Sequence, residues 1–233
     1  MRQSGSILIV ALWALFFLGA LAVSVGTRAA AGIRVAEHVK LVSRLNHVAR
    51  AGVAQGIAAA RSGNEEIMSG EASEYWSRAN DSVAGGVFDV YSVVQAGDLG
   101  VVTNFGIISE GTKTNINNMV QVRSLLETVA EGASAALIEE NIREYRKAKK
   151  TLTKGRSNGR FESIYELLLV DGVTGDLFES IEPVITIFSS DCYSGTAVAR
   201  FSAPSGDEDE PMPERQIKFV YDSKKQTIVY WEQ

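Results

Sequence analysis

The chain has 233 residues, 45% of them apolar, and a formal net charge of -5. This length allows one domain with a sizeable core plus an appendage, and the acidic balance argues against a protein built to coat nucleic acid, because phosphate-binding domains carry a basic excess. The single cysteine, Cys192, excludes an internal disulfide and zinc sites built from several thiolates, and the two histidines, His38 and His47, leave little material for histidine catalysis.

The first element is an apolar segment. Residues 6–26 follow Gly5 and contain no charged side chain. About 20 helical residues span the roughly 30 Å hydrocarbon core of a bilayer. Three interpretations fit: a cleaved secretory signal with Ala20-Leu21-Ala22 as its small-x-small site, a retained anchor, or the first half of a longer helix.

The segment after it continues in helical register, without proline or turn residues, up to Ser62-Gly63-Asn64. The sequence therefore predicts one helix over residues 7–61 that is apolar all round in its first half and amphipathic in its second. A narrow apolar stripe along the second half needs a surface to pack on. Its members are Val35, Val39, Val42, Leu45, Ala49, Val53, Ile57 and Ala60.

Short β-branched and aromatic runs follow. Residues 85–94 and 100–109 are predicted to be strands of a hairpin around residues 95–98. From residue 115 the pattern becomes helical. Asn117 is predicted to cap one helix and Ser134 a second, which places a small helical insertion between strands. The predicted core positions of these helices are Met119, Val122, Leu126, Val129, Ile138, Ile142 and Tyr145.

The second helix leads into a basic stretch, residues 143–160. Two readings stay open for it: a helix-hairpin-helix nucleic-acid module, or a solvated helix end with cations near the helix C-terminus. The remaining chain is predicted to contain a leucine-rich helical turn, a loop and a β-like run at 184–188 within residues 161–190, then a strand at 196–203. It closes with a hairpin at 216–233 that turns at residues 222–225.

No enzymatic constellation is found: the sequence has no glycine-rich phosphate loop, nucleophile elbow or metal-ligand spacing. We therefore expect a protein that is not an enzyme, with no catalytic residue. The acidic run Asp207-Glu208-Asp209-Glu210 leaves calcium binding open, but the EF-hand spacing is absent, so no metal ligand is assigned.

Taken together, these segments resemble type IV pilins and type II secretion pseudopilins, and more narrowly the K-type minor pseudopilins (general secretion pathway protein K). Four stretches carry the resemblance: SGSILIVALWAL at the start, FGIISEGTKTNIN, FESIYELLLVDGVTGDLFESIEPVITIF, and the closing hairpin. The chain departs from the family in lacking most of a large helical insertion, so it resembles a shortened form.

The resemblance implies an α+β, type IV pilin-like fold in which a long N-terminal helix packs on an antiparallel sheet. Prepilin peptidase would cut between Gly5 and Ser6 and methylate the new amine, and Val10 would be the fifth mature residue, where most pilins carry glutamate but K-type members do not. The implied regions are a leader (1–5), a transmembrane half-stem (6–26), an amphipathic half-stem (27–62), a first strand region (63–114), a helical insertion (115–180) and closing strands (181–233).

The function implied by the resemblance is assembly with other minor pseudopilins at the tip of a filament, to start its assembly and support protein export. Residues 6–26 would hold the subunit in the membrane, and the apolar stripe over residues 35–60 would pack on neighbouring stems. Its partners would be the I- and J-type minor pseudopilins, the major pseudopilin, the inner-membrane assembly platform and prepilin peptidase, with no nucleic acid.

The expected place is the bacterial inner membrane, crossed once, with the C-terminal domain in the periplasm. The charges that flank the apolar segment, Arg2 against Arg28 and Arg34, hardly favour one orientation over the other. The alternatives are a signal-anchored extracytoplasmic binding domain unrelated to filaments and the nucleic-acid module described above.

Overall fold

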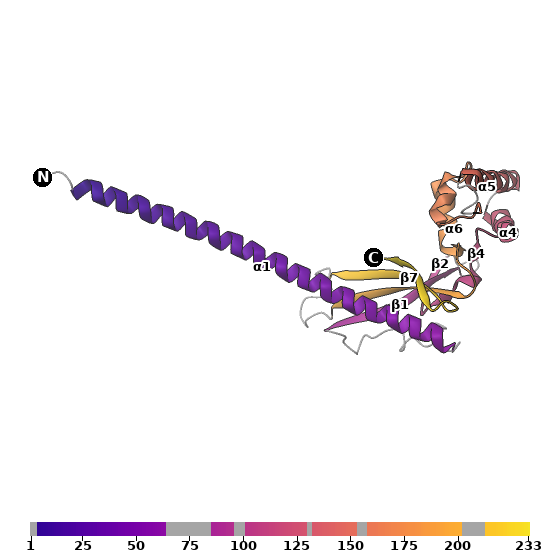
Figure 1. Ribbon diagram of the computed structural model, residues 1–233, viewed down its shortest axis with the longest axis horizontal. Coiled ribbons are helices and arrows are strands. Elements are labelled where there is room, and N and C mark those ends of the chain that lie inside the picture. The colour runs from indigo at the N-terminus through magenta and orange to yellow at the C-terminus, as the bar shows by residue number, and fades with distance from the viewer. Residues whose placement is uncertain (1–3, 64–84, 96–100, 130–131, 153–157, 202–212) are drawn as a thin grey trace.

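The computed structural model describes residues 4–63, 85–95, 101–129, 132–152, 158–201 and 213–233. A single helix, α1 (Ser4–Ser62), projects from a head that holds the other described elements, and its N-terminal end lies far from that head (Figure 1). At 1.5 Å per residue this helix is roughly 90 Å long. It ends where the sequence predicts, because Gly63 adopts a left-handed backbone conformation with φ of 62° and stops the helix.

The head is built on an antiparallel sheet with the strand order β2-β1-β6-β7-β8. Its strands are β1 (Gly86–Gln95), β2 (Val101–Phe105), β6 (Cys192–Phe201), β7 (Glu214–Asp222) and β8 (Thr227–Glu232), and a short strand, β3 (Ile108–Ser109), pairs with β6. Both predicted hairpins are confirmed: β1 pairs with β2, and β7 pairs with β8.

The strand predicted over residues 100–109 is in fact two strands with different partners. Gly106, with φ of 103°, turns the chain after β2, and its N–H donates to the carbonyl oxygen of Val90 at 2.9 Å. Ile108 then pairs with Ser194 of β6. Glycine takes this positive φ without steric cost, which explains why the run breaks there.

One face of the sheet packs on the C-terminal half of α1. The period-2 alternation of the strands places Phe88 and Val90 of β1 on that face, next to small residues of β6 and large ones of β7. The buried residues of this core are Leu45, Val48, Ala49, Val53, Ala59, Ala60, Phe88, Val90, Ile107, Ala197, Ala199, Ile217, Phe219 and Tyr221. The core of the head is therefore formed between one helix and one sheet.

Residues 110–186 form a second cluster, here called the helical unit, at the end of the head away from the projecting part of α1 (Figure 1). It contains η2 (Glu110–Thr112), β4 (Thr114–Asn115), α4 (Met119–Val129), α5 (Gly132–Leu152), η3 (Ile164–Leu169), α6 (Gly175–Ile181), η4 (Glu182–Val184) and β5 (Ile185–Thr186). The parallel pairing of β4 with β5 closes the unit, which has its own apolar core around Ile116, Leu126, Ile138 and Phe178.

The helices of this unit correct three details of the sequence analysis. Asn118, not Asn117, caps α4, since its side-chain oxygen accepts from the Val120 N–H at 3.1 Å. Ser134 does not cap α5, because that helix already begins at Gly132. The segment predicted to be a loop contains α6, capped by Thr174.

The chain therefore has an α+β fold in which a long, apolar N-terminal helix packs on an antiparallel sheet. Helical elements lie between β4 and β5, and they include α4 and α5, close to the two helices predicted from residue 115 onward.

Candidate functional site

The N-terminal half of α1 touches nothing else in the described structure. Its large apolar side chains are uncovered on every side: Leu8 is 71% exposed, Trp13 56% and Phe16 66%. This part of the helix is long and apolar enough to cross a membrane, and it lies near the N-terminus, where signal sequences also occur. Gly5 and Ser6 lie in the first turns of α1, and Val10 is 64% exposed. The exposed part of α1, residues 8–40, is here called the shaft.

The apolar stripe of α1 divides into two parts with different surroundings. Val35 and Val39 are exposed, at 64% and 60%, whereas Leu45, Ala49 and Val53 are almost completely buried against the sheet of the same chain. The expectation that the whole stripe packs on neighbouring stems is therefore wrong for the buried part, because the head itself covers it. The partly buried members are Val42 and Ile57.

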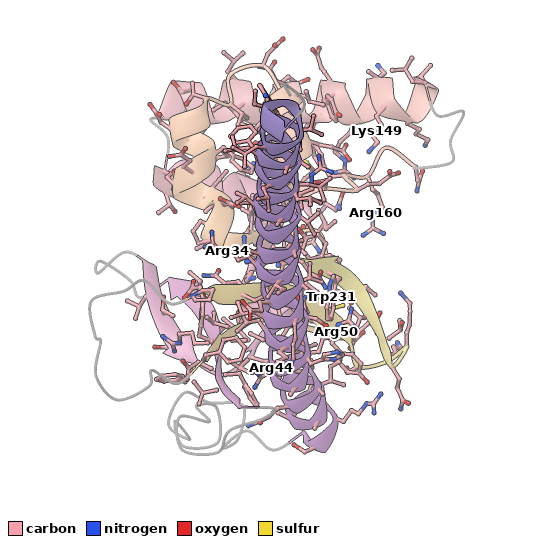
Figure 2. The ribbon with its side chains drawn as sticks, turned by 90° about the vertical axis from the view of Figure 1, so that its left-hand side faces the viewer. Arg34, Arg44, Arg50, Lys149, Arg160 and Trp231 are labelled. Atoms are coloured by element: carbon pink, nitrogen blue, oxygen red, sulfur yellow. The ribbon has the colours of Figure 1, made fainter. Side chains whose placement is uncertain are left out.

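Basic side chains follow the apolar segment along α1. Arg28 and Arg34 lie on its exposed part. Arg44 and Arg50 lie further on, where the helix meets the sheet, as the view along α1 shows (Figure 2). The Arg44 guanidinium lies 5.1 Å from the ring centre of Phe201, and the Arg50 guanidinium 5.9 Å from that of Trp231. These last two cations therefore help to join helix and sheet.

A buried carboxylate joins the helical unit to the sheet. Glu110 is only 3% exposed, and its oxygens accept hydrogen bonds from Thr186 and Ser194 and from the Lys113 ammonium at 2.6 Å. Because each oxygen has at least one donor, the desolvation of this charge is compensated. The segment FGIISEGTKTNIN, singled out in the sequence, supplies Glu110 and Lys113, while Ser194 comes from β6.

A cleft of about 490 Å³ lies next to this network, between the sheet and the helical unit. At its rim the Tyr165 hydroxyl donates to Glu182 at 3.3 Å, and the Tyr230 hydroxyl donates to Glu232 at 2.9 Å. Burial, the hydrogen bond to Glu232 and the charges of Glu232 and Glu182 raise the pKa of Tyr230 to about 12. Burial and the charges of Glu182 and Glu232 likewise raise the pKa of Tyr165. The two pairs therefore share one negative environment.

Sequence reasoning missed this cleft. Its rim residues come from η3, η4 and β8, which are far apart along the chain, and no local motif marks them. Only the pairing of the helical unit with the sheet brings them together.

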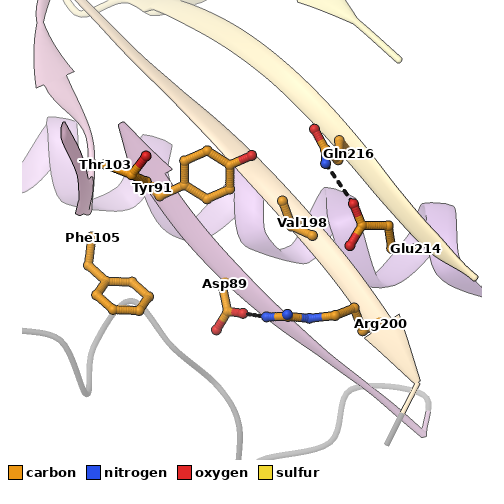
Figure 3. A pocket seen from close by; sticks show the side chains of 8 residues that line it. All are labelled: Asp89, Tyr91, Thr103, Phe105, Val198, Arg200, Glu214 and Gln216. Carbon is orange, nitrogen blue, oxygen red and sulfur yellow. Dashed lines mark hydrogen bonds and ion pairs between the residues drawn. The ribbon is translucent and has the colours of Figure 1, made fainter. Parts of the chain in front are cut away.

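A second, open hollow lies on the face of the sheet that does not pack on α1 (Figure 3). It has a volume of about 340 Å³, and Asp89 and Arg200 form an ion pair across it. Burial and the charge of Glu214 raise the pKa of Tyr91. The Gln216 amide donates to Glu214 at 2.7 Å. Asp89 therefore pairs with Arg200 and Glu214 with Gln216, so these polar side chains satisfy one another on this face of the sheet.

Three cations of the basic stretch 143–160 contact other residues of the helical unit. Arg143 pairs with Glu139 at 2.6 Å, and Arg146 donates to the carbonyl oxygen of Gly159 at 3.1 Å. Lys149 donates to Glu166 at 2.6 Å. These contacts account for three of its cations by internal structure, and residues 153–157 lie outside the described part.

No group of three or more His, Cys, Asp and Glu side chains that could hold a metal ion occurs among the described residues. The acidic run at 207–210 lies outside them.

Comparisons of the chain with models of known protein families, with curated proteins and with solved structures found no match.

Proposed function

We propose that the chain is a K-type minor pseudopilin of a type II secretion system, or of a related pilus-like system, in a shortened form. In this function it joins the I- and J-type minor pseudopilins at the filament tip, starts assembly and supports protein export. The protein crosses the bacterial inner membrane once, with a cytoplasmic N-terminus and its head in the periplasm.

One observation carries this proposal: the exposed apolar part of α1 and the part of α1 that packs into the core of the head belong to one unbroken helix. Leu45, Val48 and Ala49 are core residues of the head, and α1 runs back from them without a break to Ser4. A secretory signal cut after Ala22 would leave a shaft from Val23 onward with nothing to cover Val35 and Val39. A simple tether needs no rigid connection between membrane and core.

The bare shaft also supports a role in side-by-side stem packing. Because the sheet already covers the stripe from Leu45 onward, neighbouring subunits would contact the stem through the membrane segment and through Val35 and Val39. Val10 suits a tip subunit, since an apolar residue at that position leaves no buried carboxylate that requires a cationic partner.

Mass spectrometry of the mature protein tests the proposal. We expect the chain to begin at N-methylated Ser6. An intact Met1 would indicate a plain anchor, a start near Val23 would indicate a secreted domain, and either result would refute the proposal. A Gly5→Val variant should stay unprocessed, whereas a Gly19→Val control, with nothing within 4 Å of the added side chain, should be processed normally.

Copurification tests the tip role separately. In mild detergent the processed chain should copurify with other pseudopilins of the same host. A chain that is processed correctly but recovered only as a monomer would contradict assembly at the tip.

A further inference from the structure

The cleft between the sheet and the helical unit has a buried floor and an exposed rim. Ser92, Glu110 and Thr186 line it and are at most 6% exposed, so they form the floor. Tyr165 and Tyr230 line it and are 46% and 38% exposed, so they belong to the rim. Its volume of about 490 Å³ lies within the range typical of ligand-binding sites in proteins.

The charges that line this cleft do not balance. Four carboxylates face two ammonium groups. Glu110 and Lys113 neutralise each other at the floor. At the rim Lys218 lies 3.7 Å from Glu232, and both side chains are about half exposed, so this pair is weak. The carboxylates of Glu162 and Glu182 have no cation in the lining that compensates them, which leaves the cleft negative.

Aromatic rings stand beside these carboxylates. The rings of Phe188 and Tyr230 have centroids 6.3 Å apart, and Tyr165 lines the same cleft. The hydroxyls of both tyrosines donate to Glu182 and Glu232, so the carboxylates are held next to the rings. A cation in such a site is attracted both by the carboxylates and by the negative faces of the rings. The arrangement offers acceptors and π faces to a ligand.

The sheet favours a polypeptide as the ligand. Val229, Tyr230 and Glu232 of the lining belong to β8, which pairs only with β7 and forms an edge of the described sheet. The outer backbone groups of an edge strand can bind an extended chain. A polypeptide that lies along β8 would bring a side chain to the rim.

We propose that this cleft binds an arginine or lysine side chain of an extended segment in a partner protein, with Glu182 and Glu232 as carboxylate acceptors and Tyr165, Phe188 and Tyr230 as aromatic walls. The site is independent of the proposed function, because it rests on the lining of the cleft and not on α1.

Calorimetric titration of the full chain in micelles of a polyoxyethylene detergent tests the site. The probe is the acetylated and amidated peptide Thr-Val-Arg-Val-Thr, and its control contains citrulline, the neutral isostere, in place of arginine. The arginine peptide should bind at least about tenfold more tightly, a difference of roughly 1.4 kcal/mol, and its affinity should fall with rising salt.

Matched variants locate the binding. Glu182→Gln should weaken binding of the arginine peptide by about tenfold, whereas Glu214→Gln, the same change in the other hollow of the sheet, should leave it unchanged. Tyr230→Phe keeps the aromatic face and should retain most of the affinity, whereas Tyr230→Leu should lose it. Near-ultraviolet circular dichroism checks that each variant is folded.

Several results would overturn the site. These are equal affinity for the arginine and citrulline peptides, equal effects of Glu182→Gln and Glu214→Gln, or equal affinity of Tyr230→Phe and Tyr230→Leu. Tighter binding of free spermidine than of the peptide would assign the cleft to a small polyamine. If the chain binds cellotriose but does not bind the peptide, the cleft is a site for a neutral sugar. Both of these outcomes contradict a protein partner.

Discussion

Gly56 lets α1 approach the sheet closely, and its replacement by alanine gives a sharp test of that packing. A Cβ atom at this position would lie 2.6 Å from Cζ of Phe219 and 3.3 Å from Cγ2 of Ile107. The Phe219 ring cannot easily move away, because it is 1% exposed. It also lies so close to Gly195 that a Cβ atom at that position would be 3.3 Å from the ring. The added methyl group therefore has to displace packed core atoms.

The net effect of Gly56→Ala is the difference between two terms. Alanine gains about 1 kcal/mol over glycine inside a helix. Overpacking a core costs about 1–3 kcal/mol, and the confined ring puts this site at the upper end. We expect a net loss of about 2 kcal/mol, which lowers the Tm of a domain of this size by about 4–8 °C.

Thermal unfolding of the full chain in detergent, followed by near-ultraviolet circular dichroism, measures this loss. Gly32→Ala is the matched control, since nothing lies within 4 Å of its added methyl group, and it should leave Tm unchanged or slightly higher. Phe219→Leu should partly rescue Gly56→Ala, so that the double variant loses about 1 kcal/mol less than the sum of the two single changes. A Gly56→Ala protein as stable as Gly32→Ala, or strictly additive changes, would refute the close packing.

Three further changes test the polar contacts. Glu110→Ala leaves Lys113 without its buried partner and should cost about 3 kcal/mol in thermal unfolding; a loss below about 1 kcal/mol would contradict the network. Burial opposes ionisation of Glu166, yet hydrogen bonds from Lys149 and the Glu162 N–H lower its pKa below the ordinary 4.5. The ionised Glu166 therefore stabilises the folded chain above pH 4.5, and this stabilisation is lost as the pH falls through the lowered pKa. Glu166→Gln should flatten the acid side of a plot of Tm against pH. The pKa of Tyr230 is 10.0 in the unfolded chain and is raised to about 12 in the folded chain. As the pH rises from 10.0 to about 12, the unfolded chain therefore releases this proton more readily than the folded chain, and the free energy of unfolding should fall. Tyr230→Phe should remove that fall, and an unchanged alkaline profile would argue against the Tyr230–Glu232 contact.

Several elements could be predicted from the sequence because their signals are local. Gly63 marks the end of α1, and alternating residues around Asp222 mark the β7–β8 hairpin. In that hairpin the Asp222 side chain accepts from the N–H groups of Lys224 and Lys225, so a single residue both ends the strand and builds the turn.

Other features depend on contacts between distant segments and had no local signal. The stripe on α1 predicted a partner surface, but period alone does not say whether a neighbour or the chain's own sheet covers Leu45. The α6 helix buries only Phe178 and Ile181, too few positions to show a helical period. Asn117 looks like a helix cap, yet its side chain accepts from the N–H of Phe161 and holds two remote segments together.

The unbroken course of α1 also determines the direction in which the head faces. Between Gly26 and Leu45, the first fully buried core residue, the helix has no break at which rotation can be absorbed. Each residue inserted there would turn the head by about 100° around the helix axis and move it outward by about 1.5 Å. The number of residues in this stretch therefore sets the angle of the head around the helix axis, and adding or removing one residue changes that angle without changing any surface residue of the head.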